Sequence, residues 1–518
     1  MKKIIAVLFS VIVFISVIPP LPASAANEDV LTIRVCNWEE YIDEGGWDEE
    51  EVIDLESGDI FGETALYEEF EDWYYENYGQ RVHIEYSCFG TNEELYNMLT
   101  LGDEFDLVAP SEYMIMKLLA EDRLVPFSDD FFDEENELNY YIRNVSPFIR
   151  ETFESNEING EYWNRYAACY MWGVVGFLYN PEAVSEEDVS TWNILVNEDY
   201  RRQMTLKDNV RDSYFATLGA IKGDLLLSDD FRNDPDYHER LAEEMNDTSP
   251  ETVEGALAFL QQAKDNVYSF ETDSGKADMV TGKVLVNLQW SGDAVYAMDQ
   301  AEEEDFELDF SVPEECTNLW FDGWVMLKDG IGDSAEKQRA CEAFINFLSR
   351  PDNAVRNMYY IGYTSSIAGG TDGDQIIEYI DWTYSAGEDE EDTVEYDLGY
   401  FFDGSLYGED AGEGSGEYIL TVPEEQTRRQ LFAQYPPREV TDRSAIMRYF
   451  DSEANARINQ MWICVRCYNI GKINAAGWVA IALAIVIVIS AAVYMRLKEK
   501  RVKDVKVNRR PLRIRQPR

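Results

Sequence analysis

The stretch Leu31-Thr-Ile-Arg-Val-Cys-Asn-Trp-Glu-Glu-Tyr41 decides the fold of this 518-residue chain. Residues 31–36 form a β-rich run that predicts a strand, and residues 37–41 close it. A strand that ends in two aromatic residues around two carboxylates places π-faces and negative charge at the C-terminal edge of a sheet, where ligands bind in open α/β sheets. The motif therefore suits an organic cation, held by cation–π contact and charge-assisted hydrogen bonds. An exposed acidic loop is the alternative interpretation of the same five residues.

Strand-like and helix-like segments alternate after this motif, which favours an α/β fold. Residues 81–86 and 105–109 are typical of strands. Between them, Thr91-Asn-Glu-Glu94 is a capping box and predicts that a helix begins there. Pro110 and Ser111 end the second strand, and a further helix is expected to follow them.

The length of the chain calls for more than one domain. Residues 27–472 are too many for a single hydrophobic core, so at least two domains are expected. Two apolar runs, 170–179 and 320–327, are suited to strands that cross between two lobes. Two acidic, glycine-containing segments, 43–63 and 387–417, are expected to be surface excursions.

The N-terminus has the pattern of a secretory signal peptide over residues 1–25. Lys2 and Lys3 supply positive charge, residues 4–18 are apolar, and Ala23-Ser-Ala25 is a small-residue cleavage pattern. We therefore expect an exported protein.

The C-terminus carries a second apolar run without charge, residues 475–494. A helix of that length, at about 1.5 Å per residue, matches a hydrocarbon core about 30 Å thick. The segment 495–518 is rich in Lys and Arg, which places it in the cytoplasm by the positive-inside rule. The prediction is a single-pass protein of the cell membrane, anchored by a C-terminal transmembrane helix, with an extracellular N-terminal domain.

Composition excludes several classes of function. A formal net charge of −58 argues strongly against nucleic acid as a partner, because phosphate contacts need basic patches. The chain has only two histidines, which weakens any hypothesis of a histidine base or a histidine-rich metal site. No glycine-rich phosphate loop or nucleophile elbow is present. We expect no enzyme, and therefore no catalytic residue, no metal and no cofactor.

Several motifs follow one another in a characteristic order: Asn37-Trp-Glu-Glu-Tyr41, Phe105-Asp-Leu-Val-Ala-Pro-Ser-Glu-Tyr113, Trp172-Gly173, Ser190-Thr-Trp192, Leu288-Gln-Trp-Ser-Gly292, Trp320-Phe-Asp322, Ala343-Phe-Ile-Asn-Phe-Leu348 and Ile361-Gly-Tyr363. This series resembles the spermidine/putrescine-binding proteins, the extracytoplasmic receptors of polyamine ABC importers, over roughly residues 31–470. The resemblance implies a type II two-lobed periplasmic-binding-protein fold, in which hinge closure traps the ligand. The first α/β lobe would be residues 27–165 plus about 322–370, and the second 166–321 plus about 371–470.

The resemblance also implies which residues bind the ligand. Glu39 stands where relatives often have a small polar residue, and Asn209 stands where they often have a carboxylate. The implied set is Trp38, Glu39, Glu40, Tyr41, Ser111, Tyr113, Asn209, Arg211, Asp212, Trp290, Trp320, Asp322 and Tyr363.

The function implied is that of a membrane-tethered, monomeric solute-binding protein that captures spermidine or putrescine and delivers it to an ABC permease. The physics agrees, because spaced carboxylates match ammonium groups and aromatic walls desolvate the methylenes. Three alternatives remain open. They are a receptor of the same fold for another organic cation such as thiamine, a cation-sensing ectodomain without transport, and a glycoside hydrolase that pairs carboxylates such as Glu40 and Asp322.

Overall fold

The computed structural model describes residues 30–48, 51–387, 390–405 and 418–467, together with residues 483, 485–487, 489, 490 and 494. The chain divides into two compact units, Met1–Ile458 and Asn459–Arg518. The sheet and the candidate site both belong to the first unit.

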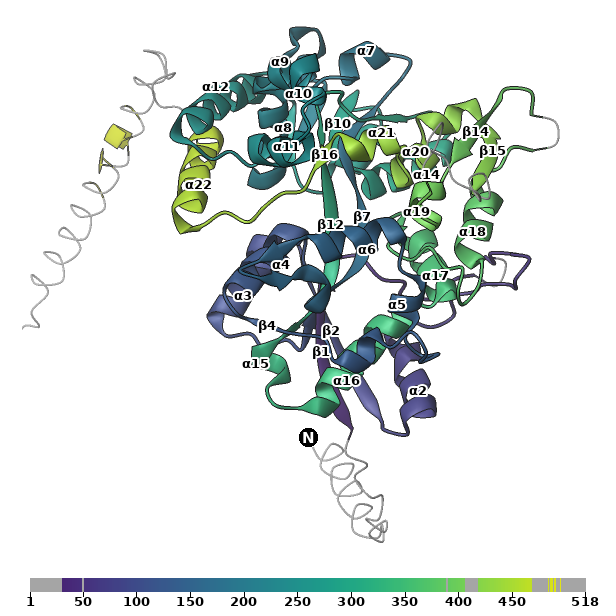
Figure 1. Ribbon diagram of the computed structural model, residues 1–518. Helices are drawn as coiled ribbons and strands as arrows, with labels where there is room; N and C mark the ends of the chain where they lie inside the picture. Colours follow the sequence, from purple (N-terminus) through teal and green to yellow (C-terminus); the bar gives the residue numbers. More distant parts are fainter. Residues whose placement is uncertain are drawn as a thin grey trace, which may run out of the picture. The chain divides into compact units, whose positions relative to one another are not determined.

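A single path of hydrogen-bonded strands runs through the first unit (Figure 1), in the order β2 (Val82–Phe89), β1 (Leu31–Trp38), β3 (Leu107–Val108), β12 (Thr317–Leu327), β7 (Ala167–Tyr179), β10 (Val286–Trp290), β8 (Met204–Lys207) and β9 (Ser269–Glu271). At one end β1 pairs in parallel with β2 and β3, and at the other β8 pairs in parallel with β10 and β9. The two long strands β7 and β12 are antiparallel and lie between these parts. The result is two α/β lobes that share two crossing strands.

The crossing strands are explained by their sequences. Every residue of β7 and of β12 is buried, as expected for apolar runs that are covered on both faces. The register of β12 against β7 shifts between Asp322 and Gly323, which is a β-bulge. A bulge redirects the side chains beside it, and Ser111 forms an isolated bridge to Asp322 at the same place. The short strand β13 (Thr364–Ser365) also pairs with β7.

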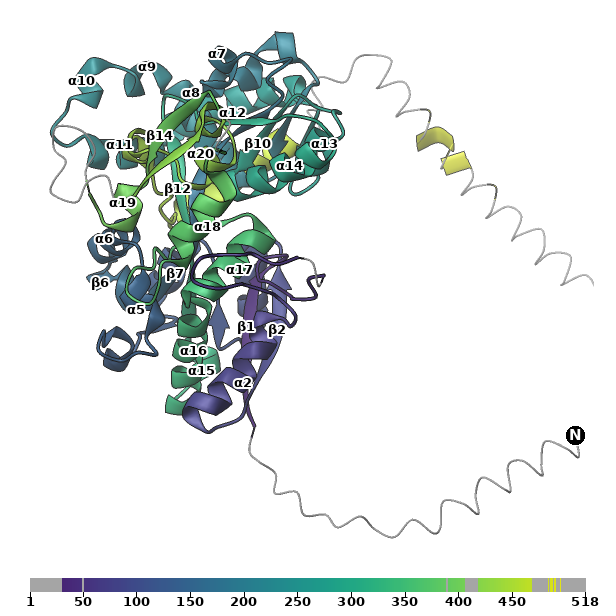
Figure 2. The same ribbon diagram turned by 90° about the vertical axis from the view of Figure 1, so that its right-hand side faces the viewer.

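Helices cover both parts of the sheet (Figure 2). In the first lobe α2 packs on β2, and α16 packs on β1 and α2. The helices of the first lobe and its edge are α2 (Leu66–Tyr78), α3 (Asn92–Leu101), α4 (Glu112–Ala120), α5 (Tyr140–Asn144), α6 (Pro147–Ser155), α15 (Lys328–Ile331), α16 (Ala335–Leu348), α17 (Pro351–Ile361), α18 (Gln375–Tyr384) and α19 (Gly399–Phe402).

In the second lobe α8 packs on β8, and α11 and α12 pack on α8. The helices of this lobe are α7 (Glu186–Val189), α8 (Val210–Ile221), α9 (Gly223–Leu226), α10 (Asp229–Arg232), α11 (Tyr237–Met245), α12 (Pro250–Asn266), α13 (Gly275–Val280), α14 (Ser291–Glu303), α20 (Gln430–Gln434) and α21 (Arg438–Asp442). Helix α22 (Ser452–Arg466) contains residues of both compact units. Short strands complete the structure: β4 (Leu124–Val125), β5 (Glu157–Ile158), β6 (Glu161–Tyr162), β11 (Asp309–Ser311), β14 (Thr393–Asp397), β15 (Ile419–Pro423) and β16 (Ser444–Ala445).

Local sequence signals set the helix ends near the candidate site. The Thr91 hydroxyl accepts a hydrogen bond from the Glu94 amide at 3.1 Å, as the capping box predicts, while the Glu94 carboxylate accepts from the Gly90 amide at 2.9 Å. Helix α17 begins at Pro351 and ends at Ile361, and Gly362 caps it with a φ of 74°, the left-handed conformation that a glycine adopts without strain. These signals fix where the next loop begins.

The acidic segment 43–63 is not a loose excursion. Oδ2 of Asp43 lies 2.6 Å from Nη2 of Arg356, and both side chains are buried. Trp47 and Ile53 are also buried. The sequence prediction overlooked this anchoring because the partner of Asp43 lies far along the chain. Of the second acidic segment, 387–417, residues 388–389 and 406–417 lie outside the described residues.

The predicted C-terminal anchor is corrected by the structure. Of the residues described, no helix is long and apolar enough to cross a membrane, which contradicts the transmembrane helix over 475–494 and the single-pass, membrane-anchored localisation built on it. An apolar run shows that a segment can partition into lipid, but it does not establish a continuous helix. Most of 475–494, the signal peptide 1–25 and the basic tail 495–518 lie outside the described residues.

Candidate ligand-binding site

The turn after β1 directs Tyr41 into the protein. The Asn37 side chain holds this turn, since its amide group donates to the Tyr41 carbonyl at 3.2 Å and its oxygen accepts from the Trp38 amide at 2.9 Å. Glu40 has a left-handed φ of 54°, which reverses the chain. The Tyr41 hydroxyl then donates to Oδ2 of Asp322 at 2.8 Å. The first motif and the crossing strand β12 therefore meet.

Asp322 is a buried carboxylate with an unused oxygen. Its side chain lies at the bulge of β12, and the residue is only 6% exposed. Of the described atoms, none is a hydrogen-bond partner of Oδ1. Burial, with a smaller contribution from the neighbouring Asp212 carboxylate, raises the pKa of Asp322 to about 7. A buried carboxylate in this state is costly unless a cation joins it.

Tyr41, whose hydroxyl contacts this carboxylate, belongs to a cluster of aromatic rings. The Tyr363 ring lies 4.9 Å from the Tyr41 ring and 5.7 Å from the Trp320 ring, centroid to centroid. Two glycines make room for these rings. A Cβ on Gly292 would come within 2.3 Å of the Tyr363 ring, and a Cβ on Gly173 within 2.6 Å of the Trp320 ring. The site therefore combines buried negative charge with ring faces, as the sequence predicts for an organic cation.

Trp290 and Asp212 form the part of the site that belongs to the second lobe. Trp290 ends β10 and precedes α14. The Trp290 indole lies beside the Asp212 carboxylate and favours its ionised form, which by itself lowers the pKa of Asp212. Burial raises the pKa of Asp212 to about 6, although the charge of Lys207 opposes the rise. Asp212 is 7% exposed, so this is a second buried carboxylate beside an aromatic ring.

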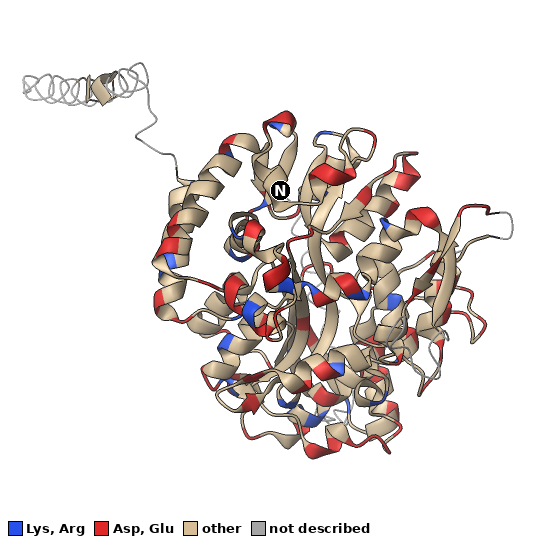
Figure 3. Cartoon of the chain, turned by 45° about the horizontal axis from the view of Figure 1, so that its top comes forward, with Lys and Arg blue, Asp and Glu red and all other residues tan. Residues whose placement is uncertain are grey.

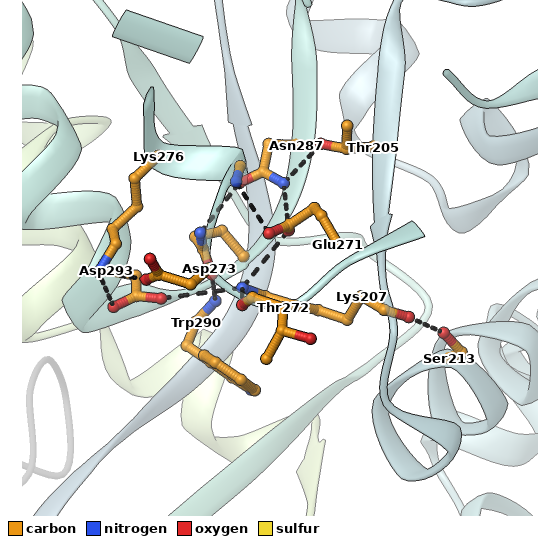
Figure 4. A network of polar contacts seen from close by, with 12 residues as sticks. Thr205, Lys207, Ser213, Glu271, Thr272, Asp273, Lys276, Asn287, Trp290 and Asp293 are labelled. Carbon is orange, nitrogen blue, oxygen red and sulfur yellow. Dashed lines mark hydrogen bonds and ion pairs between the residues drawn. The ribbon is translucent and has the colours of Figure 1, made fainter. Parts of the chain in front are cut away.

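A polar network lies behind Trp290 (Figure 4). Nζ of Lys207 donates to the Thr272 carbonyl at 3.0 Å and lies 3.5 Å from Oε1 of Glu271 and 3.8 Å from Oδ2 of Asp293. Lys276 pairs with the same Asp293 at 3.4 Å. The hydroxyl of Tyr363 donates to Oδ1 of Asp293 at 2.9 Å. Asp293 therefore connects the aromatic wall around Asp322 with the lysines.

Arg211 contacts Tyr113 across the site. Its guanidinium carbon lies 4.2 Å from the centroid of the Tyr113 ring and 3.9 Å from that of Phe450, on the segment before α22. The Tyr113 hydroxyl is within 3.0 Å of the Asn92 amide nitrogen and donates to Glu93 at 3.3 Å. Arg211 is 6% exposed, so it acts as a stacked and desolvated cation at this position.

Three predicted ligand residues have other local partners. The oxygen of Asn209 accepts from the Arg211 amide at 2.7 Å and the Asp212 amide at 3.4 Å, which makes Asn209 the N-cap of α8. Ser111 precedes α4, but its hydroxyl accepts from Asn92 at 3.0 Å and does not cap that helix. Trp38 is half-buried against Phe89, with a centroid distance of 4.7 Å.

Glu39 and Glu40 are exposed in the turn after β1. Ten of the thirteen predicted residues lie around Asp322, Asp212 and Trp290 or in the turns next to them. The other three, Glu39, Glu40 and Trp38, are peripheral. Glu40 consequently does not face Asp322 as one of a buried pair of acids, the arrangement that a glycoside hydrolase needs.

Four residues of this region are not among the thirteen predicted ligand residues: Lys207, Glu271, Asp293 and Glu112. Lys207 ends a strand whose residues are all buried, and a lysine in that position signals an internal partner. Asp293 directly follows the motif that ends at Gly292. Glu112 is 1% exposed and accepts from the Phe321 amide at 3.2 Å, and burial raises the pKa of its carboxyl to about 8. Nothing local in the sequence marks Glu271.

Comparison with known proteins gives a consistent result. Residues 65–382 match the model of a family of bacterial extracellular solute-binding proteins. The chain is 24% identical over 285 residues to the spermidine/putrescine-binding periplasmic protein of Salmonella typhimurium, an alignment that covers 54% of this chain and 70% of that protein. It is 23% identical over 303 residues to the putrescine-binding periplasmic protein PotF of Escherichia coli, covering 56% and 72%.

Two solved structures share the fold. The spermidine/putrescine substrate-binding protein PotD of Streptococcus pneumoniae is 22% identical with a TM-score of 0.52, and the match covers 84% of this chain and 98% of that one. The TpPotD lipoprotein of Treponema pallidum is 16% identical with a TM-score of 0.53, covering 84% and 99%. These matches support a two-lobed α/β binding-protein architecture.

Proposed function

Since this chain belongs to the bacterial extracellular solute-binding proteins, we propose that it captures a polyamine, spermidine or putrescine, between its two lobes and delivers it to an ABC permease. The family consists of proteins that bind solutes, so the chain is a binding protein and not an enzyme. The lobe boundaries of the sequence prediction, 27–165 plus about 322–370 and 166–321 plus about 371–470, are part of this proposal.

One observation carries the proposal: among the described atoms Oδ1 of Asp322 has no hydrogen-bond partner, while Oδ2 is held by Tyr41, whose ring lies 4.9 Å from the Tyr363 ring. A ligand ammonium would supply the cation that this buried carboxylate lacks, and the Tyr41 hydroxyl already holds Oδ2. Tyr363 and Trp320 would flank the methylenes next to that ammonium, each contact contributing roughly 0.5–2 kcal/mol. Asp212 beside Trp290 would receive a second ammonium.

The relatives support the choice of ligand. Proteins named for binding spermidine and putrescine match this chain over more than half of its length. The charge of the chain agrees with a cationic ligand. Figure 3 shows Asp and Glu spread over the helices and loops, with fewer Lys and Arg, and a net charge of −58 raises the local concentration of cations.

Two crossing strands support capture by closure. β7 and β12 each pass from one lobe to the other, and such shared segments serve as hinges in two-lobed receptors. Asp322 lies on β12 itself, whereas Tyr41 and Trp290 come from the two sides. A ligand that contacts all three residues would favour the closed arrangement of the two lobes. The permease would then receive the ligand from this closed form.

Calorimetric titration of the purified full chain with putrescine, spermidine, thiamine and a neutral sugar tests the proposal. We expect heat of binding with at least one polyamine at micromolar protein, together with a change in tryptophan fluorescence from Trp290 or Trp320. Binding of thiamine alone would replace the proposed ligand by another organic cation. The absence of heat with both polyamines would overturn the proposal.

A further inference from the structure

Lys207 places an ammonium group of the protein on the face of Trp290. Nζ of Lys207 lies 4.1 Å from the centroid of the Trp290 ring, and the Lys207 side chain is fully buried. Trp290 is one of the rings proposed to flank the ligand. An internal cation therefore already occupies a cation–π position of the site.

The surroundings of Lys207 are built to keep it there (Figure 4). Glu271 is fixed by the Gly275 amide at 2.8 Å and by the Asn287 amide group at 3.0 Å. With Asp293 it supplies two carboxylates to one buried ammonium. Removing a single partner from a buried charge pair leaves an uncompensated charge, so this arrangement resists the withdrawal of Lys207.

Asp322 and Asp212 differ from these two carboxylates. Among the described side chains, neither Asp322 nor Asp212 forms an ion pair with a lysine or arginine, whereas Glu271 and Asp293 both do. Four buried or nearly buried carboxylates thus fall into two kinds. Two are already matched by ammonium groups of the protein, and two are open to ammonium groups of a ligand.

We infer that Lys207 occupies the place of a third ligand ammonium, so that the site takes a diamine such as putrescine in preference to a triamine such as spermidine. The inference rests on the proposed function and specifies the ligand class of the same site. A triamine bound at Asp322 and Asp212 would bring its third ammonium toward Lys207 or leave it outside the carboxylates. Repulsion between like charges in a desolvated site then disfavours the longer ligand.

The test compares putrescine and spermidine by calorimetry on the full chain and on Lys207→Ala. The natural chain should bind putrescine at least about tenfold more tightly than spermidine. In Lys207→Ala, Glu271 is left without a lysine partner and Asp293 keeps only Lys276. The ratio should therefore move toward spermidine by about tenfold or more, the scale of one charge-assisted contact. The matched control is Lys283→Ala, which removes an exposed lysine paired with Asp278 and should leave the ratio unchanged.

A double variant, Lys207→Met with Glu271→Gln, removes the buried cation together with one carboxylate. It burdens folding less than Lys207→Ala because it leaves no lone carboxylate at position 271. A third ammonium would find only Asp293, which Lys276 still pairs, so the ratio should move toward spermidine by less than in Lys207→Ala. If Lys207→Ala does not fold, the inference is tested by the ratio of putrescine to spermidine affinity in the natural chain and in the double variant.

Equal or tighter binding of spermidine by the natural chain would overturn the inference, and so would an unchanged ratio in a folded Lys207→Ala. A shift in the double variant as large as in Lys207→Ala would overturn it too, because the vacated carboxylates would then not be the cause. Failure of every polyamine to bind the natural chain is a different result, since it would overturn the proposed function and the inference with it.

Discussion

The hydroxyl of Tyr41 lies 2.8 Å from Oδ2 of Asp322, although 281 positions separate the two residues in sequence. Tyr41 stands in the turn after the first strand, and Asp322 stands at the bulge of a strand that crosses both lobes. This hydrogen bond satisfies one oxygen of the carboxylate and orients the other, which has no hydrogen-bond partner among the described residues. It is the contact around which the binding proposal is built.

Binding of a polyamine should weaken as the pH falls through 7. Burial raises the pKa of Asp322 to about 7, and an ammonium ligand needs the ionised carboxylate, so below pH 7 a proton must leave before the ligand binds. The affinity should fall by up to about tenfold per pH unit below 7, with a second loss near pH 6 where Asp212 titrates.

Calorimetry at pH 6 and 8, in buffers of different ionisation enthalpy, measures both the affinity and the protons released. Putrescine stays fully charged over this interval, so the protein alone supplies the dependence. Equal affinity at pH 6 and pH 8 would show that the Asp322 carboxylate does not contact the ligand.

Glu112→Gln should stabilise the protein at high pH. The folded-state pKa of Glu112 is about 8, above its ordinary value near 4.5, because burial penalises the charged form. The folded state therefore holds the proton more tightly than the unfolded state, and stability is lost as the pH rises from 4.5 to 8. Glutamine does not ionise in this way. The free energy of unfolding of Glu112→Gln should therefore exceed that of the natural chain by a margin that grows to roughly a few kcal/mol above pH 8.

Urea unfolding of both proteins at pH 5 and 9 measures this difference. Glu134→Gln, at an exposed position that pairs with Arg150, is the matched control and should show no comparable growth between the two pH values. A Glu112→Gln effect of the same size at pH 5 and 9 would contradict the assignment of a buried, protonated carboxyl.

Gly292→Ala should weaken ligand binding through Tyr363. A Cβ at position 292 would lie 2.3 Å from the Tyr363 ring, so the ring must move, and overpacking of this kind costs about 1–3 kcal/mol. The displacement would also disturb the bond of the Tyr363 hydroxyl to Asp293. We expect roughly tenfold weaker putrescine binding by calorimetry.

Gly255→Ala is the matched control for this variant. It lies within α12, where a Cβ would make an ordinary contact with Ile221 at 3.7 Å. Its affinity should equal that of the natural chain. Natural affinity in Gly292→Ala would show that the position of Tyr363 does not matter to binding.

The sequence predicts the architecture well because its signals are local. Continuous apolar runs mark the crossing strands, and a capping threonine and a glycine turn mark helix ends. The meeting of Tyr41 with Asp322 followed only from the family resemblance, since nothing local connects them. Asn209 illustrates the limit in the other direction, because an asparagine that looks like a lost ligand carboxylate is the N-cap of α8.

The position of the Lys207 ammonium lies beyond sequence reasoning. Lys207 ends the buried strand Met204–Lys207, and its partners Glu271, Asp293 and Trp290 come from three other segments. The C-terminal run 475–494 shows the converse error, because hydropathy and flanking charge led to a membrane-spanning helix that no described residues form. Composition shows which environments a segment can occupy, and contacts with residues distant in sequence determine which structure it adopts.

The affinity of Asp322→Asn for putrescine, measured by calorimetry at pH 8 beside the natural chain and Asp129→Asn, tests the central claim most directly. Asparagine keeps the shape and can still accept the Tyr41 hydrogen bond, but it removes the charge that an ammonium ligand would meet. Asp129 is almost fully exposed, and its variant should bind normally. We expect a loss of about tenfold or more in Asp322→Asn, the scale of one charge-assisted hydrogen bond. Natural affinity in that variant would contradict the central claim.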